Sequence, residues 1–201
     1  KASTLLGIDQ ARSKLFSGAS GKVLEIGAGT GLNLSTYDPS KLTSLTLLDV
    51  SQGMLAEAQK RWQNASFQQH GDWENVKVEF VQADATTELV EKFGVGSFDT
   101  VVDSFSLCVM GNDGASKCLD QMRQVVKPGG KVLLLENSRA SNPILGAYQD
   151  ATANAAASAG GKGCVYNQNV EAMIKATNGL RIEQQKAYAA GLFRSFECSV
   201  R

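Results

Sequence analysis

The sequence of 201 residues has little that would mark a zinc or redox protein. It contains a single histidine, His70, in a polar stretch, and four cysteines that lie far apart and form no C-x-x-C pair: Cys108, Cys118, Cys164 and Cys198. We therefore expect no metal site. We also expect reduced, mostly packed thiols, which fit an intracellular, reducing compartment.

The chain also lacks net charge, because 20 lysines and arginines balance 20 aspartates and glutamates. No overall field draws it towards nucleic acid or anionic lipid, so nucleic acid is not a favoured partner. No apolar run approaches the ~20 residues that cross a bilayer, so we expect no transmembrane segment in this chain. It begins at Lys1 without an initiator methionine, which indicates a trimmed or processed protein.

What is present fits one globular domain over residues 1–201, since 43% of the residues are hydrophobic. Residues 1–20 are expected to hold an N-terminal helix, over 1–16, and the turn that ends it. Residues 23–26 read as a buried strand that runs into a glycine loop. Glu25 interrupts this strand, and a carboxylate there needs a partner.

The loop has Gly27, Gly29 and Gly31, with Ala28 between the first two. Glycines let the backbone approach a ligand closely, and the loop is expected to open a helix from about Leu32 to Asp38-Pro39. A strand, a glycine turn and a helix form the first unit of a nucleotide-binding sheet. The dinucleotide fingerprint requires a third glycine where this chain has Leu32, which disfavours an NAD-dependent oxidoreductase.

Two acidic residues follow later strands. Asp49 ends a strand expected over 42–50, about 20 residues after the loop, where a carboxylate can hold a ribose diol. It could instead cap the helix over 52–62, but Ser51 can take that role. Met54 either lies against an adenine ring or packs in the core. Asp84, after a strand over 76–81, either binds an adenine amino group beside Ala85 or forms a turn.

Further along, a short helix is expected over 86–93, a strand over 98–103, a helix over 115–126 and a strand over 131–136. Asp103 ends the fourth strand, and Ser104-Phe105-Ser106-Leu107-Cys108 follow it, beside any ligand at the carboxyl edge of the sheet. Asp103 is a candidate catalytic base, although a structural role in a turn or cap is the alternative.

Residues 137–169 are the least typical part of the chain. Asn142-Pro143 starts an alanine-rich helix that runs to Ala159 and breaks at residues 160–163. We interpret 137–169 as a substrate cover, or else as a docking surface for a partner protein. Asn167 is expected to cap a helix through Ala176, and two strands over 180–188 and 192–200 then form a hairpin.

Together, E-x-G-x-G-x-G over 25–31, Asp49, Asp84-Ala85 and Lys127-Pro128-Gly129-Gly130 resemble the class I S-adenosylmethionine (AdoMet)-dependent methyltransferases. The resemblance covers about residues 20–201 and implies an α/β fold: a Rossmann-like, seven-stranded mixed sheet with helices on both faces and a C-terminal antiparallel hairpin. It implies AdoMet as the cofactor. The residues expected to bind it are Glu25, Gly27, Ala28, Gly29, Gly31, Asn33, Asp49, Val50, Ser51, Met54, Asp84, Ala85, Ser104 and Phe105.

Within this class, Ser106-Leu107-Cys108 and Gly163-Cys164 resemble the small methyltransferase-like thiol methyltransferases, close to the ubiquinone and menaquinone methyltransferases. This implies a small or lipophilic acceptor, such as a thiol or quinone, near Cys108, Tyr148 and Tyr166. Relatives often carry an N-terminal membrane or organelle-targeting segment, so a mitochondrial, chloroplast or membrane-associated form stays open. The alternative is a non-catalytic subunit that kept the fold inside a larger complex.

Overall fold

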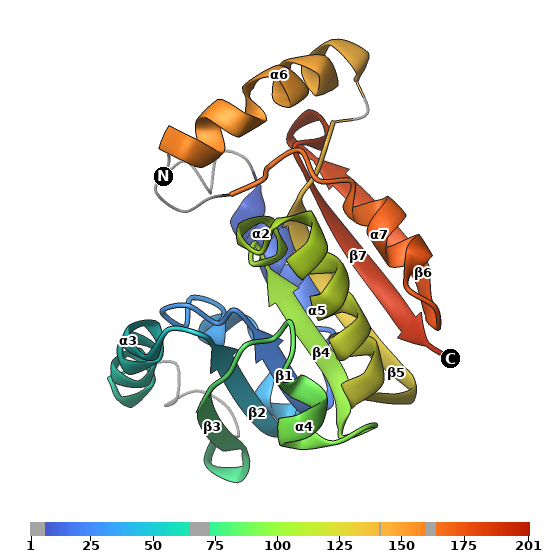
Figure 1. Ribbon diagram of the computed structural model, residues 1–201. Coiled ribbons are helices and arrows are strands. Elements are labelled where there is room, and N and C mark those ends of the chain that lie inside the picture. The colour runs from blue at the N-terminus through green and yellow to red at the C-terminus, as the bar shows by residue number, and fades with distance from the viewer. Residues whose placement is uncertain (1–6, 65–72, 141, 160–163) are drawn as a thin grey trace.

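The computed structural model describes residues 7–64, 73–140, 142–159 and 164–201 (Figure 1). The expected helical residues 1–6, the stretch around His70 and the glycine break at 160–163 lie outside the described residues.

One seven-stranded sheet forms the centre of the molecule, with the strand order β3-β2-β1-β4-β5-β7-β6. Its strands are β1 Gly21–Ile26, β2 Leu42–Asp49, β3 Lys77–Gln82, β4 Phe98–Ser104, β5 Val126–Asn137, β6 Leu180–Tyr188 and β7 Phe193–Val200. The first five are parallel to one another, and β7 is antiparallel to both β5 and β6. This confirms the mixed sheet and the C-terminal hairpin.

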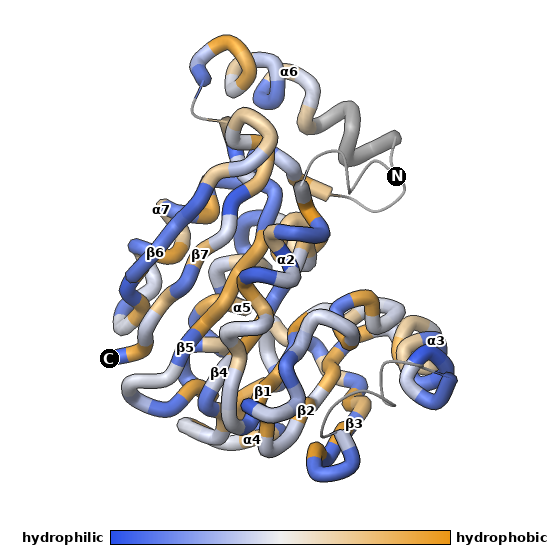
Figure 2. Tube along the Cα trace, turned by 180° about the vertical axis from the view of Figure 1, so that it is seen from behind, coloured by the Kyte–Doolittle hydropathy of each residue, from blue (hydrophilic) through white to orange (hydrophobic). Residues whose placement is uncertain are grey.

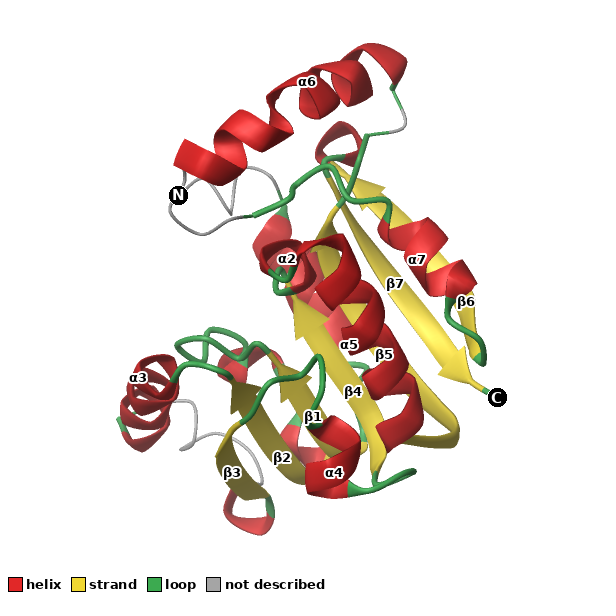
Figure 3. Cartoon of the chain, in the orientation of Figure 1, coloured by secondary structure: helices red, strands yellow, loops and turns green. Residues whose placement is uncertain are grey.

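Helices cover both faces of the sheet (Figure 3). They are α2 Ile8–Phe16, α3 Gln52–Gln63, α4 Leu89–Phe93, α5 Gly111–Val125, α6 Pro143–Ala159 and α7 Val170–Ala176. Because side chains alternate along a strand, β1 sends Leu24 and Ile26 into the core under α4, α5 and α7. Val23 points into the opposite core, under α2.

The outer strand β6 is mostly hydrophilic, whereas the central strands are apolar (Figure 2). A polar, exposed edge strand discourages further strand pairing. At the carboxyl end of the sheet, α6 extends beyond the body of the domain (Figure 1). Its start at Pro143 and its end at Ala159 agree with the sequence prediction.

The prediction of a helix after the glycine loop is wrong. Two short 3-10 turns, η1 Leu34–Thr36 and η2 Pro39–Lys41, replace it. Only seven residues separate Gly31 from Pro39, and Gly31 has a positive φ of 74°. A stretch this short, rich in Asn, Ser and Thr, has too few helix-favouring residues to complete stable turns.

Other boundaries also differ from the prediction. Strand β5 begins at Val126 rather than Lys131, so the expected turn Lys127-Pro128-Gly129-Gly130 lies inside this strand. Helix α5 begins at Gly111 rather than Ala115, and α4 spans only five residues. Helix α7 is capped by Asn169, whose side chain accepts from Ala172 N over 3.1 Å. The amide of Asn167 instead donates to Asp150, which lies on α6. Asn167 therefore ties the segment after α6 to that helix.

Candidate cofactor site at the carboxyl edge of the sheet

A cavity of about 570 Å³ lies at the carboxyl ends of β1 to β4. The strand order reverses between β1 and β4, and ligands of open parallel sheets bind at such a switch point. The volume is within the usual range for a small-molecule site. Its lining consists of Gly27, Leu48, Asp49, Val50, Ala83, Asp84, Ala85, Thr86, Thr87, Phe105, Ser106, Val109, Met110, Asp113, Gly114 and Lys117.

The glycine loop forms one wall of this cavity through Gly27. Gly27, Gly29 and Gly31 have positive φ angles of 58°, 55° and 74°, which favour glycine. A Cβ atom on Gly27 would overlap the side chain of Ser106, with the Ser106 Oγ at 2.9 Å. The loop therefore packs directly against the residues that follow β4.

Asp49 holds the end of β2 to this loop. One carboxylate oxygen accepts from Gly29 N over 2.9 Å, and the other accepts from Ser51 N over 2.8 Å. Ser51 itself caps α3 by accepting from Met54 N, which confirms that Asp49 is not the cap. A carboxylate can accept about four hydrogen bonds, so Asp49 keeps acceptor capacity for the cavity that it lines.

Asp84 forms the turn that was one of its two expected roles, and it also lies at the cavity. Its Oδ1 accepts from both the backbone N and the hydroxyl of Thr86, over 2.8 and 2.7 Å, so it forms a turn after β3. It also lines the cavity together with Ala85. The turn fixes the direction of the carboxylate and leaves it at the ligand side.

Glu25 is fully buried below the loop and has the partners that its position requires. Asn33 Nδ2 donates to one carboxylate oxygen over 2.8 Å, and the Tyr37 hydroxyl donates to the other over 2.7 Å. Asn33 also donates to Ser104 Oγ, over 3.0 Å. Burial raises the pKa of Glu25 to about 7, although the hydrogen bonds from Tyr37 and Asn33 lower it. This network joins β1, η1 and β4 beneath the loop.

Asp103, expected to act as the catalytic base, is fully buried and does not line the cavity. Its Oδ1 accepts from the Ser106 hydroxyl over 2.6 Å, and its carboxyl group also contacts Glu136 of β5. Burial raises the pKa of Asp103 to about 7, and burial and Asp103 raise that of Glu136. The geometry therefore does not support a direct role as a base, because the carboxyl group cannot touch an acceptor.

The structure brings part of the expected site together. Six of the residues expected to bind the cofactor line the cavity: Gly27, Asp49, Val50, Asp84, Ala85 and Phe105. Seven others lie in or next to the same loops and strand ends but do not line the cavity: Glu25, Ala28, Gly29, Gly31, Asn33, Ser51 and Ser104. Met54 is 42% exposed on α3 and is not part of the lining.

The wall of the cavity that follows β4 was predicted only in part. Phe105 and Ser106 were expected beside the ligand, whereas no pattern in the sequence indicated that Val109, Met110, Asp113 and Lys117, up to the first turns of α5, also line the cavity. Asp113 and Lys117 form an exposed ion pair of 2.7 Å, one helical turn apart. A prediction that began α5 at Gly111 rather than Ala115 would have placed Asp113 and Lys117 at the carboxyl edge of the sheet. The two glycines in the first turn hid that start, since glycine disfavours helix.

The three residues expected near the acceptor do not line this cavity. Tyr148 is 65% exposed on α6, and Cys108 is buried. The Tyr166 hydroxyl hydrogen-bonds to Thr152 of α6. The α6 segment is held further by the Arg139–Asp150 ion pair and by buried Gln149, whose amide pairs with Ala140 N and Ser138 O. Residues 137–169 thus form a connected unit beyond the sheet, as far as the structure describes them.

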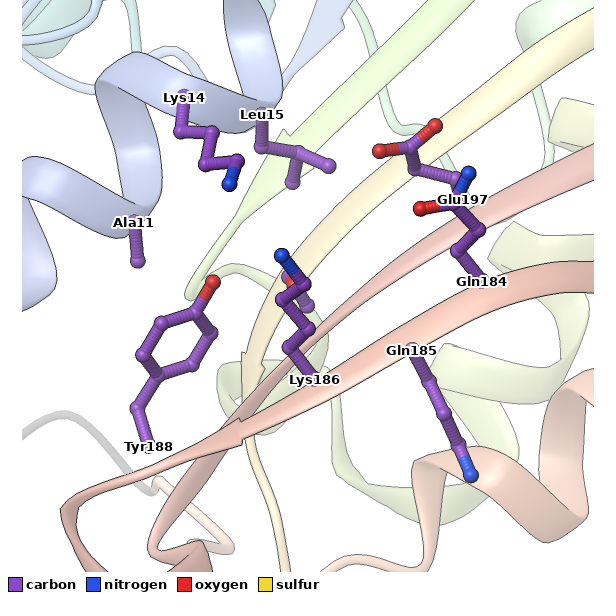
Figure 4. A pocket seen from close by; sticks show the side chains of 9 residues that line it. Ala11, Lys14, Leu15, Gln184, Gln185, Lys186, Tyr188 and Glu197 are labelled. Atoms are coloured by element: carbon purple, nitrogen blue, oxygen red, sulfur yellow. The ribbon is translucent and has the colours of Figure 1, made fainter.

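A second, much smaller cleft of about 40 Å³ lies between α2 and β6, where Lys14, Lys186 and Tyr188 surround it (Figure 4). It has room for about one water molecule and is no candidate for an organic ligand. Among the described residues, no three His, Cys, Asp or Glu side chains group together as they would around a metal ion.

The large cavity fits AdoMet by its chemistry. It offers the Asp49 carboxylate for a ribose diol, and Asp84 and Ala85 for a purine. Gly27 leaves room for the backbone to lie against the ligand.

Comparison with known proteins agrees with this geometry. Residues 23–130, more than half of the chain, match the family model described as "Methyltransferase domain". The mitochondrial methyltransferase OMS1 of Saccharomyces cerevisiae is 30% identical over 135 residues, which are 64% of this chain and 28% of OMS1. The ubiquinone/menaquinone biosynthesis C-methyltransferase UbiE of Hahella chejuensis is 34% identical over 144 residues, 69% of this chain and 51% of UbiE. The chain therefore spans about half or less of these two relatives.

Solved structures show the same fold at low sequence identity. A SAM-dependent methyltransferase from Methanosarcina mazei is 16% identical with a TM-score of 0.69, and the match covers 93% of this chain and 95% of the M. mazei chain. The [4+2]-cyclase SpnF is 14% identical with a TM-score of 0.67, covering 96% of this chain and 79% of its own. Since the second of these is called a cyclase, the fold alone does not define the reaction.

Proposed function

Because this chain belongs to the class I AdoMet-dependent methyltransferases, we propose that it transfers the AdoMet methyl group to a small or lipophilic acceptor such as a thiol or a quinol. The observation that carries the cofactor half of this proposal is the shared cavity. It places Gly27, Asp49 and Asp84, from three successive strand ends, around one space of suitable size.

Each wall of the cavity has a distinct part in this proposal. Asp49 would accept hydrogen bonds from the ribose hydroxyls, and Asp84 and Ala85 would hold the adenine. Glu25, Asn33 and Tyr37 keep the glycine loop in place from behind. When bound, AdoMet supplies a methyl group already activated by its sulfonium charge. The protein then contributes mainly orientation of the partners and exclusion of water.

The ionisable side chains that line the cavity favour an acceptor that needs little activation. No histidine is among the described lining residues, Asp49 and Asp84 are assigned to the cofactor in this proposal, and Asp113 forms an ion pair with Lys117. A thiol is partly ionised at neutral pH, and its thiolate is a strong nucleophile. A lipophilic acceptor is further supported by relatives named as quinone methyltransferases and as a phosphatidylethanolamine N-methyltransferase.

An organellar setting remains part of the proposal, supported by the mitochondrial name of one relative. None of the helices in the described part of the chain combines the length and apolar character needed to cross a bilayer.

In this proposal, residues 137–169 cover the acceptor next to the cofactor.

Methyl transfer from AdoMet carrying a labelled methyl group tests the proposal. The protein is incubated with an alkanethiol, with a short-chain quinol and, separately, with RNA and a peptide pool. We expect the label to enter the organic extract with the thiol or the quinol. Asp49→Ala should lower this incorporation strongly. Asp38→Ala, which changes an exposed carboxylate in η2 away from the cavity, should leave it unchanged.

Two results would contradict the proposal. Label that appears only in RNA or peptide would make the acceptor polar and macromolecular. AdoMet binding without transfer to any class of acceptor would support the alternative, in which the chain is a non-catalytic subunit that kept the fold.

A further inference from the structure

Cys108 and Cys164 are 56 positions apart in the sequence but lie side by side in the fold. Asn137 Nδ2, at the end of β5, approaches Cys108 Sγ at 3.6 Å and Cys164 Sγ at 3.8 Å. The backbone N of Val165 donates to the carbonyl oxygen of Cys108 over 2.8 Å. Both thiols therefore contact the same amide group, that of Asn137. All four cysteines are free and three are buried, as expected, but their wide spacing along the chain did not indicate that Cys108 and Cys164 meet.

The two cysteines differ in access to solvent. Cys164 is partly exposed, whereas Cys108 is 2% exposed in the turn η5, Leu107–Val109. Burial, Cys164 and Glu136 raise the pKa of the Cys108 thiol. An oxidant from solvent therefore reaches Cys164 first, and Cys108 is the protonated neighbour that can react with the product.

We propose that Cys108 and Cys164 form a redox-active dithiol that a peroxide converts reversibly into an intramolecular disulfide. The Cys164 thiolate attacks one peroxide oxygen, the O–O bond breaks, and a sulfenic acid and one water result. The Cys108 sulfur then attacks the Cys164 sulfur, the S–O bond breaks, and a second water leaves with the Cys108 proton. Two thiols and one hydrogen peroxide thus give one disulfide and two waters.

The place of this pair connects oxidation to the proposed site. Cys164 precedes Tyr166, which contacts α6 through Thr152, and Cys108 precedes Val109, which lines the cofactor cavity. The disulfide would join the segment after α6 covalently to the cavity wall. This inference does not depend on methyl transfer, because it concerns the thiols alone.

Counting free thiols by mass spectrometry tests it. The folded protein is treated with one equivalent of hydrogen peroxide, then unfolded and alkylated with N-ethylmaleimide. We expect the untreated protein to take up four maleimides, one for each cysteine, and the oxidised protein to take up two fewer. Peptide mapping should show Cys108 joined to Cys164, and dithiothreitol should restore full labelling.

Two single variants make the test specific. Cys164→Ser removes the exposed member, so peroxide should no longer reduce maleimide uptake. Cys198→Ser, a change at a buried cysteine of β7, is the matched control and should still lose two labels on oxidation. Unchanged labelling of the wild type, loss of only one label, or a disulfide between two chains would each overturn the proposal.

Discussion

Gly27 and Ser106 are packed so closely that no side chain fits between them: a Cβ on Gly27 would overlap Ser106 Cβ. Both residues line the cavity, one from the glycine loop and one from the segment after β4. The contact defines the width of the proposed AdoMet site between two of its walls. Its consequence can be measured by comparing two glycines of the same loop.

Gly27→Ala should weaken AdoMet binding and lower stability more than Gly29→Ala. Both glycines have positive φ angles, so both variants carry the same backbone cost of roughly 1–2 kcal/mol. Only at Gly27 does the methyl group meet another side chain, which adds about 1–3 kcal/mol. Urea denaturation and AdoMet titration of both variants measure the difference. Equal losses would show that the Gly27–Ser106 contact does not matter.

Tyr37→Phe should destabilise the protein by about 1–3 kcal/mol, because it leaves a buried Glu25 oxygen without its donor. Glu25→Gln should lower the free energy of unfolding less in the Tyr37→Phe variant than in the wild type, since Glu25 and Tyr37 act as one unit. Tyr188→Phe is the control, because that ring stacks on Phe193 with or without the hydroxyl. Additive losses in denaturation experiments would mean that Glu25 and Tyr37 are not coupled.

Asp103 should make the stability of the protein depend on pH. An unfolded aspartate has a pKa of about 3.9, whereas that of folded Asp103 is about 7, so the folded state holds an extra proton between these values. This stabilisation is complete below about pH 4 and is lost as the pH rises through 7. It amounts to at most roughly 4 kcal/mol.

Asp103→Asn should therefore reduce the decline in the free energy of unfolding between pH 5 and pH 8, and the decline that remains comes from buried Glu25 and Glu136, whose pKa values are also raised. Asp99→Asn is the matched control, because Lys127 holds the pKa of Asp99 below its ordinary value. The stabilisation from Asp99 is lost only as the pH falls, so this control should keep the wild-type decline above pH 5. A wild-type decline in Asp103→Asn would show that Asp103 does not titrate in this range.

Tyr148→Ala tests the role of α6. The side chain is 65% exposed and lies outside the cofactor cavity, so AdoMet affinity should stay within about twofold of the wild type. If residues 137–169 cover the acceptor, turnover with a thiol or quinol should fall. If they are a docking surface, turnover should persist and co-purification of a partner should weaken instead. Persistent turnover together with weaker co-purification would exclude the hypothesis that residues 137–169 cover the acceptor.

Much of the fold was predictable because the central strands are apolar runs bounded by glycine, proline or acidic residues. All seven strands were predicted, and so were the helices other than the one expected after the glycine loop. The residues at the strand ends, Asp49 and Asp84, were predictable because parallel strands bring their carboxyl ends to one edge. The partners of Glu25 were not, since Asn33 and Tyr37 reach it only because the chain there folds into a 3-10 turn.

Several other features depend on contact between segments that are distant in the sequence. The burial of Asp103 depends on Glu136 and Ser106 packing around it. The meeting of Cys108 with Cys164 depends on the path of the chain after α6. Asn169 rather than Asn167 caps α7 because Asp150 of α6 holds Asn167. No local pattern of residue types carries this information.

The most direct test of the account is calorimetric titration of AdoMet into the wild type, Asp49→Ala and Asp38→Ala. Asp49 is the residue that both ties the glycine loop to β2 and presents a carboxylate to the cavity. We predict one site in the wild type, a loss of about 1–3 kcal/mol in Asp49→Ala, and wild-type affinity in Asp38→Ala. Wild-type affinity in a folded Asp49→Ala protein would contradict the assignment of this cavity as the AdoMet site.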